Sequence, residues 1–397
     1  MNPKTFMLIA GEASGDLLAA ELVSALREQV LSSTTDLPPS PTFIGAGGPK
    51  MKAAGVHLAF DLTQHSVIGL SDVLKNYTNF RRLFKQLLKL AIGRQPDAII
   101  GVDYGGFNLR FGHAVKQYVR RHPGGWNPKI IQFVSPQVWA SRPGRAKRLA
   151  RDYDLLLSIF PFEKDWYAQR VPKLRVEFVG HPIIGRFTIA DLRLTPGNVG
   201  LGSIANRQPQ ILLLPGSREG ELRRHLPVML RALELIQSKS PEVQAKMVLP
   251  NDTLKQLADK LSALPGKVEI QIGNLPQALM QAEVAIASTG TVTMECAFFG
   301  VPTVTLYKTS WLTYQVAKRI VTVKSLTMPN LLAEEEVFPE FVQGAATPGN
   351  IAGAALDLLQ NEPRRTQIKI WLAAIVSTLG GPGASKRAAS AILSLFT

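Results

Sequence analysis

The sequence is poor in cysteine and has no long apolar run. Cys296 is the only cysteine among 397 residues, so no disulfide can form within the chain. Its neighbours in residues 294–299 are mostly apolar, which predicts a buried, unreactive thiol in a reducing compartment. No stretch approaches the roughly 20 apolar residues of a membrane-spanning helix. The short apolar run at residues 5–10 fits a buried strand better than a signal peptide, so we expect a cytoplasmic protein, soluble or peripheral to a membrane.

Acidic residues are missing from a long central stretch. Between Tyr104 and Arg151 there is no aspartate or glutamate. Ten basic residues lie there: Arg110, Lys116, Arg120, Arg121, Lys129, Arg142, Arg145, Lys147, Arg148 and Arg151. Together with the net charge of +15, this stretch indicates an anionic partner, either nucleic acid, phospholipid headgroups or a phosphorylated substrate. A solvated, solubilising surface explains the charge equally well.

The apolar runs alternate with amphipathic segments of helical length. Apolar residues make up 46% of the chain and charged residues 19%, as in a globular protein of two or three domains. The first half predicts strands at residues 6–10, 42–45, 98–102, 130–134 and 155–159. The second half predicts strands at residues 211–214, 246–249, 268–270, 284–287 and 303–307. Strands separated by helices indicate α/β domains with doubly wound parallel sheets.

Turn residues cluster at about 185–208 and suggest a domain boundary. We expect an N-terminal domain over residues 1–190 and a C-terminal domain over residues 205–365. Helices in residues 366–397 are expected to pack back across the domain interface. Ligands of doubly wound domains bind at the carboxyl ends of the strands, so the site is expected in a cleft that the two domains face.

Two loops of the second half are rich in donors suited to phosphate. After the strand at 211–214, Gly216 and Ser217 can present backbone N–H groups, and Arg218 supplies a forked cation. A capped turn with a surface arginine is the alternative, and Glu221 could hold Arg218 or cap the helix. The second loop, Thr289-Gly290-Thr291, also lies between a strand and a helix, and Glu295 follows about one helical turn later.

The Glu295 carboxylate is placed to accept both hydroxyls of a ribose, although structural capping by this loop is the simpler interpretation. In the first half, Gly11-Glu12-Ala13-Ser14-Gly15-Asp16 forms a comparable strand-to-helix turn. It suits an anion or an ordinary capped turn equally. Asp103 follows the strand at 98–102, where a carboxylate acts as a general base or caps the next helix.

Two further segments match patterns of metal-binding and membrane-binding sites. Asp152-Tyr153-Asp154 matches an Asp-x-Asp metal motif, but turn and capping chemistry explains it better, and the histidines are scattered. Residues 66–89 alternate apolar and basic side chains at helical spacing, which fits a helix on an anionic membrane or an ordinary helix against the core. The expected acceptor- and membrane-contacting residues are Val67, Ile68, Leu70, Val73, Arg81, Arg82 and Lys85.

Taken in order along the chain, these segments resemble the bacterial lipid-A-disaccharide synthases. Beside the Gly11–Asp16 turn, the matching segments are Gly45-Ala-Gly-Gly-Pro-Lys-Met, Pro96-Asp97 with Gly101-Val-Asp103, Val134-Ser-Pro-Gln-Val-Trp139-Ala, Pro161-Phe-Glu-Lys164, Phe178-Val-Gly-His181-Pro182, Leu214-Pro-Gly-Ser-Arg218, Gly290-Thr-Val-Thr-Met-Glu295 and Met328-Pro-Asn330-Leu-Leu. The family is similar to the GT-B glycosyltransferases, which have two Rossmann-like domains. The resemblance implies that the first domain binds the acceptor and the second binds the nucleotide sugar.

The resemblance also implies an activity and residue roles. Family members move 2,3-diacylglucosamine, with inversion, from its UDP carrier to 2,3-diacylglucosamine 1-phosphate, on the cytoplasmic face of the inner membrane. They need no cofactor and no metal. By position, Arg218 binds the diphosphate, Glu295 and Asn330 hold the nucleoside, and Asp103 is the catalytic base, with Glu12 as the second candidate. The expected partners are therefore the donor, the acceptor and an anionic membrane surface. A second copy of the chain, in a homodimer, is a further candidate.

Three positions differ from the family pattern and motivate an alternative. Gly106 stands where an aspartate is usual, Ser141 replaces a tryptophan, and Glu334-Glu335 replaces a Gly-Arg pair. The alternative is a divergent relative that binds nucleotide sugar or glycolipid without turning it over. Nucleic acid is not an expected partner, since the basic stretch lacks the aromatic stacking surface of such proteins.

Overall fold

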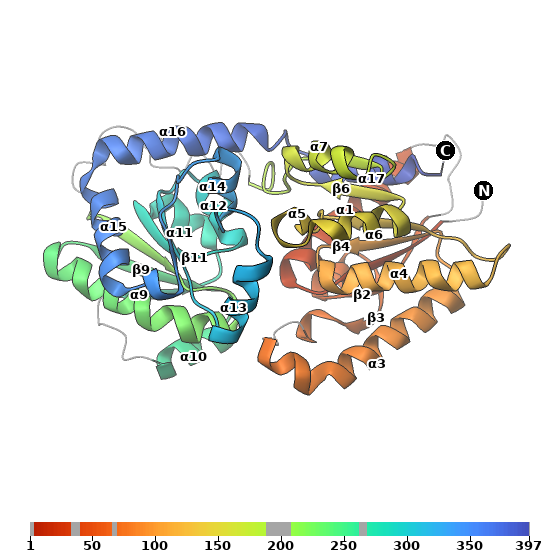
Figure 1. The fold of residues 1–397 in the computed structure, drawn as a ribbon, viewed down its shortest axis with the longest axis horizontal. Helices are drawn as coiled ribbons and strands as arrows, with labels where there is room; N and C mark the ends of the chain where they lie inside the picture. The colour runs from red at the N-terminus through yellow and green to blue at the C-terminus, as the bar shows by residue number, and fades with distance from the viewer. Residues whose placement is uncertain (1–3, 33–39, 66–69, 188–207, 262–267, 397) are drawn as a thin grey trace. The chain divides into compact units, whose positions relative to one another are not determined.

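The computed structural model describes residues 4–32, 40–65, 70–187, 208–261 and 268–396. It divides the chain into two compact units (Figure 1). The first unit comprises Met1–Arg186 and Leu379–Thr397, and the second comprises Phe187–Thr378. The sequence-expected boundary at 185–208 includes this point of division. The C-terminal segment is shared, since residues 366–378 belong to the second unit and residues 379–397 to the first.

The first unit is built on a seven-stranded parallel sheet with the order β3-β2-β1-β4-β5-β6-β7. Its strands are β1 (Thr5–Ala10), β2 (Thr42–Gly47), β3 (His57–Asp61), β4 (Ala98–Val102), β5 (Lys129–Phe133), β6 (Leu155–Ser158) and β7 (Val176–Phe178). Its helices are α1 (Ala13–Ser32), α2 (Pro49–Ala53), α3 (Leu70–Arg94), α4 (Gly105–Arg121), α5 (Val138–Ser141), α6 (Ala146–Asp152), α7 (Pro161–Arg170) and α17 (Ala384–Leu393), with 3-10 turns η1 (Thr63–His65) and η2 (Pro143–Arg145).

The second unit repeats the plan with six parallel strands in the order β10-β9-β8-β11-β12-β13. Its strands are β8 (Gln210–Leu214), β9 (Gln244–Leu249), β10 (Val268–Ile272), β11 (Val284–Ser288), β12 (Thr303–Tyr307) and β13 (Glu340–Val342). Its helices are α9 (Glu219–Lys239), α10 (Asp252–Leu261), α11 (Leu275–Gln281), α12 (Thr291–Phe298), α13 (Trp311–Ile320), α14 (Met328–Ala333), α15 (Pro348–Gln360) and α16 (Glu362–Thr378), with the 3-10 turn η3 (Gln343–Ala345).

The structure confirms the predicted fold class of two Rossmann-like α/β units. All ten predicted strands are present. Nine of them are interior strands of a parallel sheet, which is covered on both faces and therefore favours apolar runs, while β10 is an edge strand with partly exposed side chains. The sequence missed β3, β7 and β13, which are short edge strands with partly exposed side chains and no apolar run to mark them. Cys296 is buried as predicted, and this burial raises the pKa of its thiol to about 12.

Strand register brings the candidate loops of each unit to one sheet edge. In the first unit Ala10 pairs with Val102 and Val102 with Phe133, so the chain leaves β1, β4 and β5 at the same level. In the second unit Ala287 pairs with Leu214 and Ser288 with Leu306, which aligns the ends of β8, β11 and β12. In each unit, the sequence motifs therefore lie at the carboxyl edge of its own sheet, as Rossmann-like topology requires.

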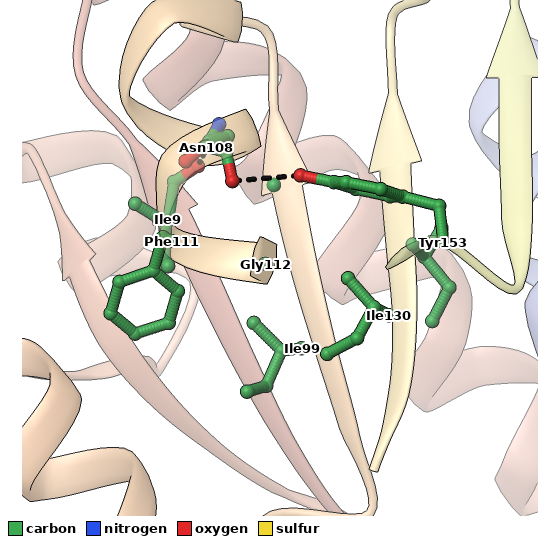
Figure 2. Close-up of a pocket in the computed structure, with 9 residues that line it drawn as sticks. Ile9, Ile99, Asn108, Phe111, Gly112, Ile130 and Tyr153 are labelled. Atoms are coloured by element: carbon green, nitrogen blue, oxygen red, sulfur yellow. Dashed lines mark hydrogen bonds between the residues drawn. The ribbon is translucent and has the colours of Figure 1, made fainter. Parts of the chain in front are cut away.

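Helix α4 packs closely on the first sheet, and a small apolar cavity remains beneath it (Figure 2). The Tyr153 hydroxyl donates a hydrogen bond of 2.7 Å to the carbonyl of Asn108 across this space. A Cβ atom on Gly112 would stand only 2.9 Å from the Tyr153 oxygen, so glycine is needed where the ring meets the helix. The cavity is lined mainly by core side chains such as Ile99 and Ile130, and it is a packing gap, not a ligand site.

A buried carboxyl group, Glu163, ties the loop after β5 to helix α7. Glu163 is fully buried and accepts hydrogen bonds from the Trp139 indole N–H (3.0 Å) and the Phe160 backbone N–H (3.3 Å). The Tyr167 hydroxyl, one turn later on α7, donates to the Pro136 carbonyl at 3.2 Å. Burial raises the pKa of Glu163 to about 7, although hydrogen bonds from Trp139 and Ser135 act in the opposite direction.

Glu163 should make stability depend on pH in a defined direction. Its pKa is higher in the folded chain than in the unfolded one, so folding takes up a proton between these values and stability falls as pH rises from about 4.5 to about 7. The free energy of unfolding should lose up to about 3 kcal/mol over this window. Glu163→Gln should remove that component.

The measurement is denaturant unfolding of both proteins from pH 5 to pH 8, expressed as the difference between wild type and variant. Glu177→Gln is the control, because Glu177 is half-exposed and paired with Lys164 and Arg175. A difference curve for Glu163→Gln as flat as the control curve would contradict the assignment.

Candidate functional site

Asp103 stands directly after β4 in a backbone conformation that few residues adopt. Its φ is +50° and that of Tyr104 is +46°, so two consecutive non-glycine residues are left-handed. Three hydrogen bonds of 2.8 Å hold the Asp103 peptide: its N–H donates to the Phe133 carbonyl, and its carbonyl accepts from the Asn108 and Gln132 amides. The side chain is half-exposed. The strained turn therefore fixes the backbone of a partly exposed aspartate at the carboxyl edge of the sheet.

The glycine turn after β1 serves this arrangement. A Cβ atom on Gly11 would stand 2.3 Å from the Tyr104 ring, so Gly11 makes room for that ring. The sequence left an anion site and an ordinary capped turn equally open here, and the structure gives Gly11 a packing reason. Glu12, the second base candidate, has a half-exposed side chain, and its carbonyl accepts the first bond of α1 from the Asp16 N–H at 2.8 Å.

Asp16 belongs to the framework. Its carboxylate is buried and accepts the backbone N–H groups of Gly48 (2.7 Å), Lys50 (2.9 Å) and Met51 (3.0 Å). These are the unsatisfied donors at the start of α2, so Asp16 caps a helix other than its own. The Gly45–Met51 motif of the sequence is thereby explained as the partner of the Gly11–Asp16 turn.

In the second unit, the Gly216-Ser217-Arg218 loop opens α9 at the end of β8. Gly216 has a φ of +122°, and a Cβ atom there would stand 2.4 Å from a carboxylate oxygen of Glu221. That carboxylate accepts the Ser217 N–H at 3.0 Å and lies 3.8 Å from the Arg218 guanidinium, which is about half exposed. Glu221 thus both caps the loop and contacts Arg218, and its oxygens use donors that a diphosphate would use.

His225 connects this loop to the end of β12, and the sequence analysis did not identify it. The ring is fully buried on α9; its Nδ1 lies 2.9 Å from the Pro215 carbonyl, and its Nε2 accepts the Lys308 N–H at 3.0 Å. Burial lowers the pKa of His225, which keeps the ring neutral and able to accept. The sequence indicated this role only by placing His225 seven residues, or about two helical turns, after Arg218.

The Thr289-Gly290-Thr291 loop follows β11 and starts α12. Gly290 has a φ of +144°, and its carbonyl accepts the Thr293 hydroxyl at 2.7 Å. Gly290 and Thr291 are exposed, while the Thr289 N–H is bonded to the Leu306 carbonyl at 3.2 Å. Glu295 lies one turn into α12 with a half-exposed side chain. The exposed part of this loop and Glu295 therefore share the carboxyl edge of the second sheet with Arg218.

Asn330 differs from the other candidates because it is buried. Its amide donates to the Phe338 carbonyl and to Glu340, and its oxygen accepts the Phe338 N–H, each at 2.8 Å. Glu340 in turn accepts the Thr327 N–H and hydroxyl at the start of α14. This network favours a positioning role for Asn330 over the direct nucleoside contact that the resemblance implied.

The expected membrane-facing residues are only partly described. Val67 and Ile68 lie outside the described residues, and Leu70 and Val73 are in the first turns of α3. Arg81, Arg82 and Lys85 are exposed on α3. The opposite side of the helix packs into the core through Leu83, Leu87 and Ala91. The helix is thus a core helix that carries a basic outer face.

Helix α13 is a second surface that the sequence analysis missed. None of its ten residues is buried, and its start is fixed by the Ser310 hydroxyl, which accepts the Thr313 N–H at 3.2 Å. Trp311, Leu312 and Val316 are 69%, 71% and 55% exposed. Residues 308–333 contain four basic residues and no acidic residue. Large apolar side chains beside cations are typical of a surface that binds membranes.

The two carboxylates of the Asp-x-Asp motif have protein partners. Asp152 is buried beside His113 (2.8 Å), Arg151 (2.8 Å) and Arg120 (3.2 Å), and Asp154 pairs with Lys116 at 3.0 Å. Burial alone would raise the pKa of Asp152, but Arg151 and His113 outweigh it and hold the pKa below its usual value.

Within the described ranges, no helix combines the length and apolar character needed to cross a bilayer.

Comparison with solved structures agrees with the fold. A UDP-N-acetylglucosamine 2-epimerase of Neisseria meningitidis, solved with UDP-N-acetylglucosamine bound, matches with a TM-score of 0.61 at 13% identity over 98% of this chain and 100% of that chain. A calicheamicin glycosyltransferase matches with a TM-score of 0.59 at 14% identity over 99% and 98%. At these identities the likeness concerns the fold alone.

Sequence comparison identifies the family. The lipid-A-disaccharide synthetase family model matches residues 6–394. The lipid-A-disaccharide synthase of Trichlorobacter lovleyi is 36% identical over 99% of this chain and 98% of its own length. That of Geobacter sulfurreducens is 34% identical over 98% and 97%. The chain therefore belongs to the lipid-A-disaccharide synthase family of glycosyltransferases.

Proposed function

We propose that this protein transfers 2,3-diacylglucosamine from its UDP carrier to 2,3-diacylglucosamine 1-phosphate, with inversion, and releases UDP. The observation that carries the proposal is the Asp103 turn, in which three hydrogen bonds of 2.8 Å hold the backbone of a strained, half-exposed aspartate at the sheet edge. Strain of about 1–3 kcal/mol per residue persists where function requires a fixed geometry. Membership of the synthase family supplies the substrates.

The chemistry is a single in-line displacement. The acceptor hydroxyl oxygen attacks the anomeric carbon of the donor sugar, and its proton passes to the Asp103 carboxylate. The bond between that carbon and the diphosphate oxygen breaks, and UDP leaves with the electron pair. Arg218 and the Gly216–Ser217 backbone stabilise the charge that develops on the diphosphate. Glu295 holds the ribose, and Asn330 and His225 keep the surrounding loops in place.

The non-catalytic alternative rests on Gly106, Ser141 and Glu334-Glu335. A Cβ atom on Gly106 would meet nothing within 4 Å, so this departure is not imposed by packing. Glu334 and Glu335 are exposed after α14. None of these positions takes part in the hydrogen bonds that hold Asp103, so the proposed base keeps its geometry.

Asp103→Asn should greatly slow transfer and leave UDP binding unchanged. Asparagine tolerates a positive φ, so the turn should survive while the base is lost. The rate should fall by about 10²–10⁴-fold, measured as UDP release from donor and acceptor in detergent micelles. Glu12→Gln tests the competing base. A larger loss in Glu12→Gln than in Asp103→Asn, or loss of UDP binding in the latter, would reject Asp103.

Arg218→Ala should weaken UDP binding by about 10–100-fold, since a charged hydrogen bond contributes about 1.5–3 kcal/mol. Isothermal titration calorimetry with UDP measures this directly. The matched control is Arg223→Ala, which removes an arginine of similar exposure from α9, the helix that follows Arg218, where it pairs with Glu219 at 3.8 Å. Equal UDP affinity in the two variants would remove Arg218 from the donor site.

We also infer that the protein contacts an anionic membrane surface. The support is the basic outer face of α3 (Arg81, Arg82, Lys85) and the exposed apolar side chains of α13. Both of its lipid substrates reside in a bilayer, so a peripheral enzyme must bind there. Tryptophan and leucine on α13 can enter the interfacial layer while Lys318 and Arg319 face the headgroups.

Trp311→Glu combined with Leu312→Glu should reduce binding to vesicles that contain anionic phospholipid by at least about tenfold, because each apolar side chain contributes about 1.5–3 kcal/mol on burial. Cosedimentation measures the partition coefficient, with zwitterionic vesicles for comparison. Ile370→Glu on α16, where Ile370 is 57% exposed, is the control for adding a carboxylate at an exposed apolar site. Binding as strong as in the control would exclude α13 as the contact.

A further inference from the structure

Four arginines lie near one another in the first unit. Arg110 is on α4, Arg142 ends α5, Arg145 caps the start of α6 and Arg148 lies within α6. We call these four residues the arginine cluster. Arg110, Arg142 and Arg148 are exposed and Arg145 is half-buried. Within the described part of the chain, none of the four forms an ion pair or a side-chain hydrogen bond.

The four guanidinium groups are close enough to influence one another. Helix α4 packs against α6, and the Arg145 N–H donates to the Arg142 carbonyl at 2.9 Å, which places consecutive arginines one turn apart. Burial lowers the pKa of Arg145, and the neighbouring charges of Arg142, Arg148 and Arg110 lower it further. Four like charges are therefore close together, and no carboxylate among the residues that the structure describes forms an ion pair with any of them.

The other end of the same helix pair is built differently. There His113, Arg120 and Arg151 surround the buried carboxylate of Asp152, with contacts of 2.8–3.2 Å. Arg110 occupies the same face of α4 as His113 and Arg120, three and ten residues earlier. One end of the α4–α6 face thus neutralises its cations internally, and the other end keeps four of them free for an external anion.

The cluster lies at the sheet edge that carries Asp103. Helix α4 begins two residues after Asp103, and Arg110 is about 8 Å further along its axis. The Asp103 N–H is bonded to the Phe133 carbonyl at the end of β5, and α5 follows five residues later. Both segments that contribute arginines therefore leave the sheet beside the proposed catalytic base.

We propose that the arginine cluster is the binding site for the 1-phosphate of the acceptor, and that it selects phosphorylated over unphosphorylated glucosamine lipid. This inference rests on the proposed function. A phosphate monoester carries nearly two negative charges, and guanidinium groups bind it through paired, charge-assisted hydrogen bonds. Its charge would relieve the repulsion within the cluster, and its attachment to the sugar would hold the acceptor beside Asp103.

The test compares two acceptors, 2,3-diacylglucosamine 1-phosphate and the same lipid without phosphate, in detergent micelles. The full chain should show a lower KM for the phosphorylated acceptor. Arg142→Gln combined with Arg145→Gln should raise that KM by about 10–100-fold, leave kcat within about twofold, and leave KM for the unphosphorylated acceptor unchanged. Lys147→Gln removes an exposed cation from α6, two residues after Arg145, and should change neither KM.

Two further measurements separate this proposal from its alternatives. Thermal unfolding should show no loss of Tm in the double variant, since it removes repulsion; a lowered Tm with equal KM increases for both acceptors would mean that the cluster is structural. Loss of binding to anionic vesicles with unchanged acceptor KM would assign it to lipid headgroups, overturning the proposal. If no transfer occurs with either acceptor, titration with glucosamine 1-phosphate still decides. Weaker binding in the double variant than in Lys147→Gln supports the site, and equal binding rejects it.

Discussion

The peptide of Asp103 is the point on which the first unit depends. Asn108 and Gln132 donate to its carbonyl, and Phe133 accepts its N–H, so helix α4 and strand β5 are both fixed to the same turn. Gly101 permits this contact, because a Cβ atom there would stand 2.6 Å from the Gln132 side chain. Gly11 is equally required by the Tyr104 ring. Several glycines and amides of the sequence thus serve one backbone conformation, which in turn fixes the carboxylate.

In the second unit, the loop at the carboxyl edge of the sheet is held by different groups. Its donor loop is held from below by His225, which bonds to Pro215 and Lys308, and from the side by Glu221. A neutral histidine and a carboxylate therefore fix the loop backbone here, as the Asn108 and Gln132 amides fix the backbone of Asp103. In both units the loops are positioned by buried or half-buried polar groups, while the side chains assigned to substrate remain at least partly exposed.

Much of the fold was predictable because central parallel strands are apolar on both faces and glycine turns mark their carboxyl ends. The edge strands β3 and β13 were not, since they are short and half-exposed. Asp103 and Arg218 could be selected as site residues from their place after a strand. The partners of Asp16 and Asn330 could not be predicted. Asp16 contacts residues more than thirty positions away, and Asn330 forms hydrogen bonds to a loop whose path no local sequence pattern indicates. The exposure of Trp311 could not be predicted either, because a helix with apolar side chains is expected in the core unless its neighbours are known.

The carboxylate of Glu221 has a consequence for how the donor loop discriminates between anions. Because it is tethered to α9 and already bonded to the Ser217 N–H, it competes for the loop at an effective concentration of about millimolar or more. An incoming anion must exchange with this internal competitor instead of filling an open site. A diphosphate brings more charge and more acceptor oxygens to this exchange than a singly charged anion does. Glu221 would thereby favour the diphosphate without contacting the sugar.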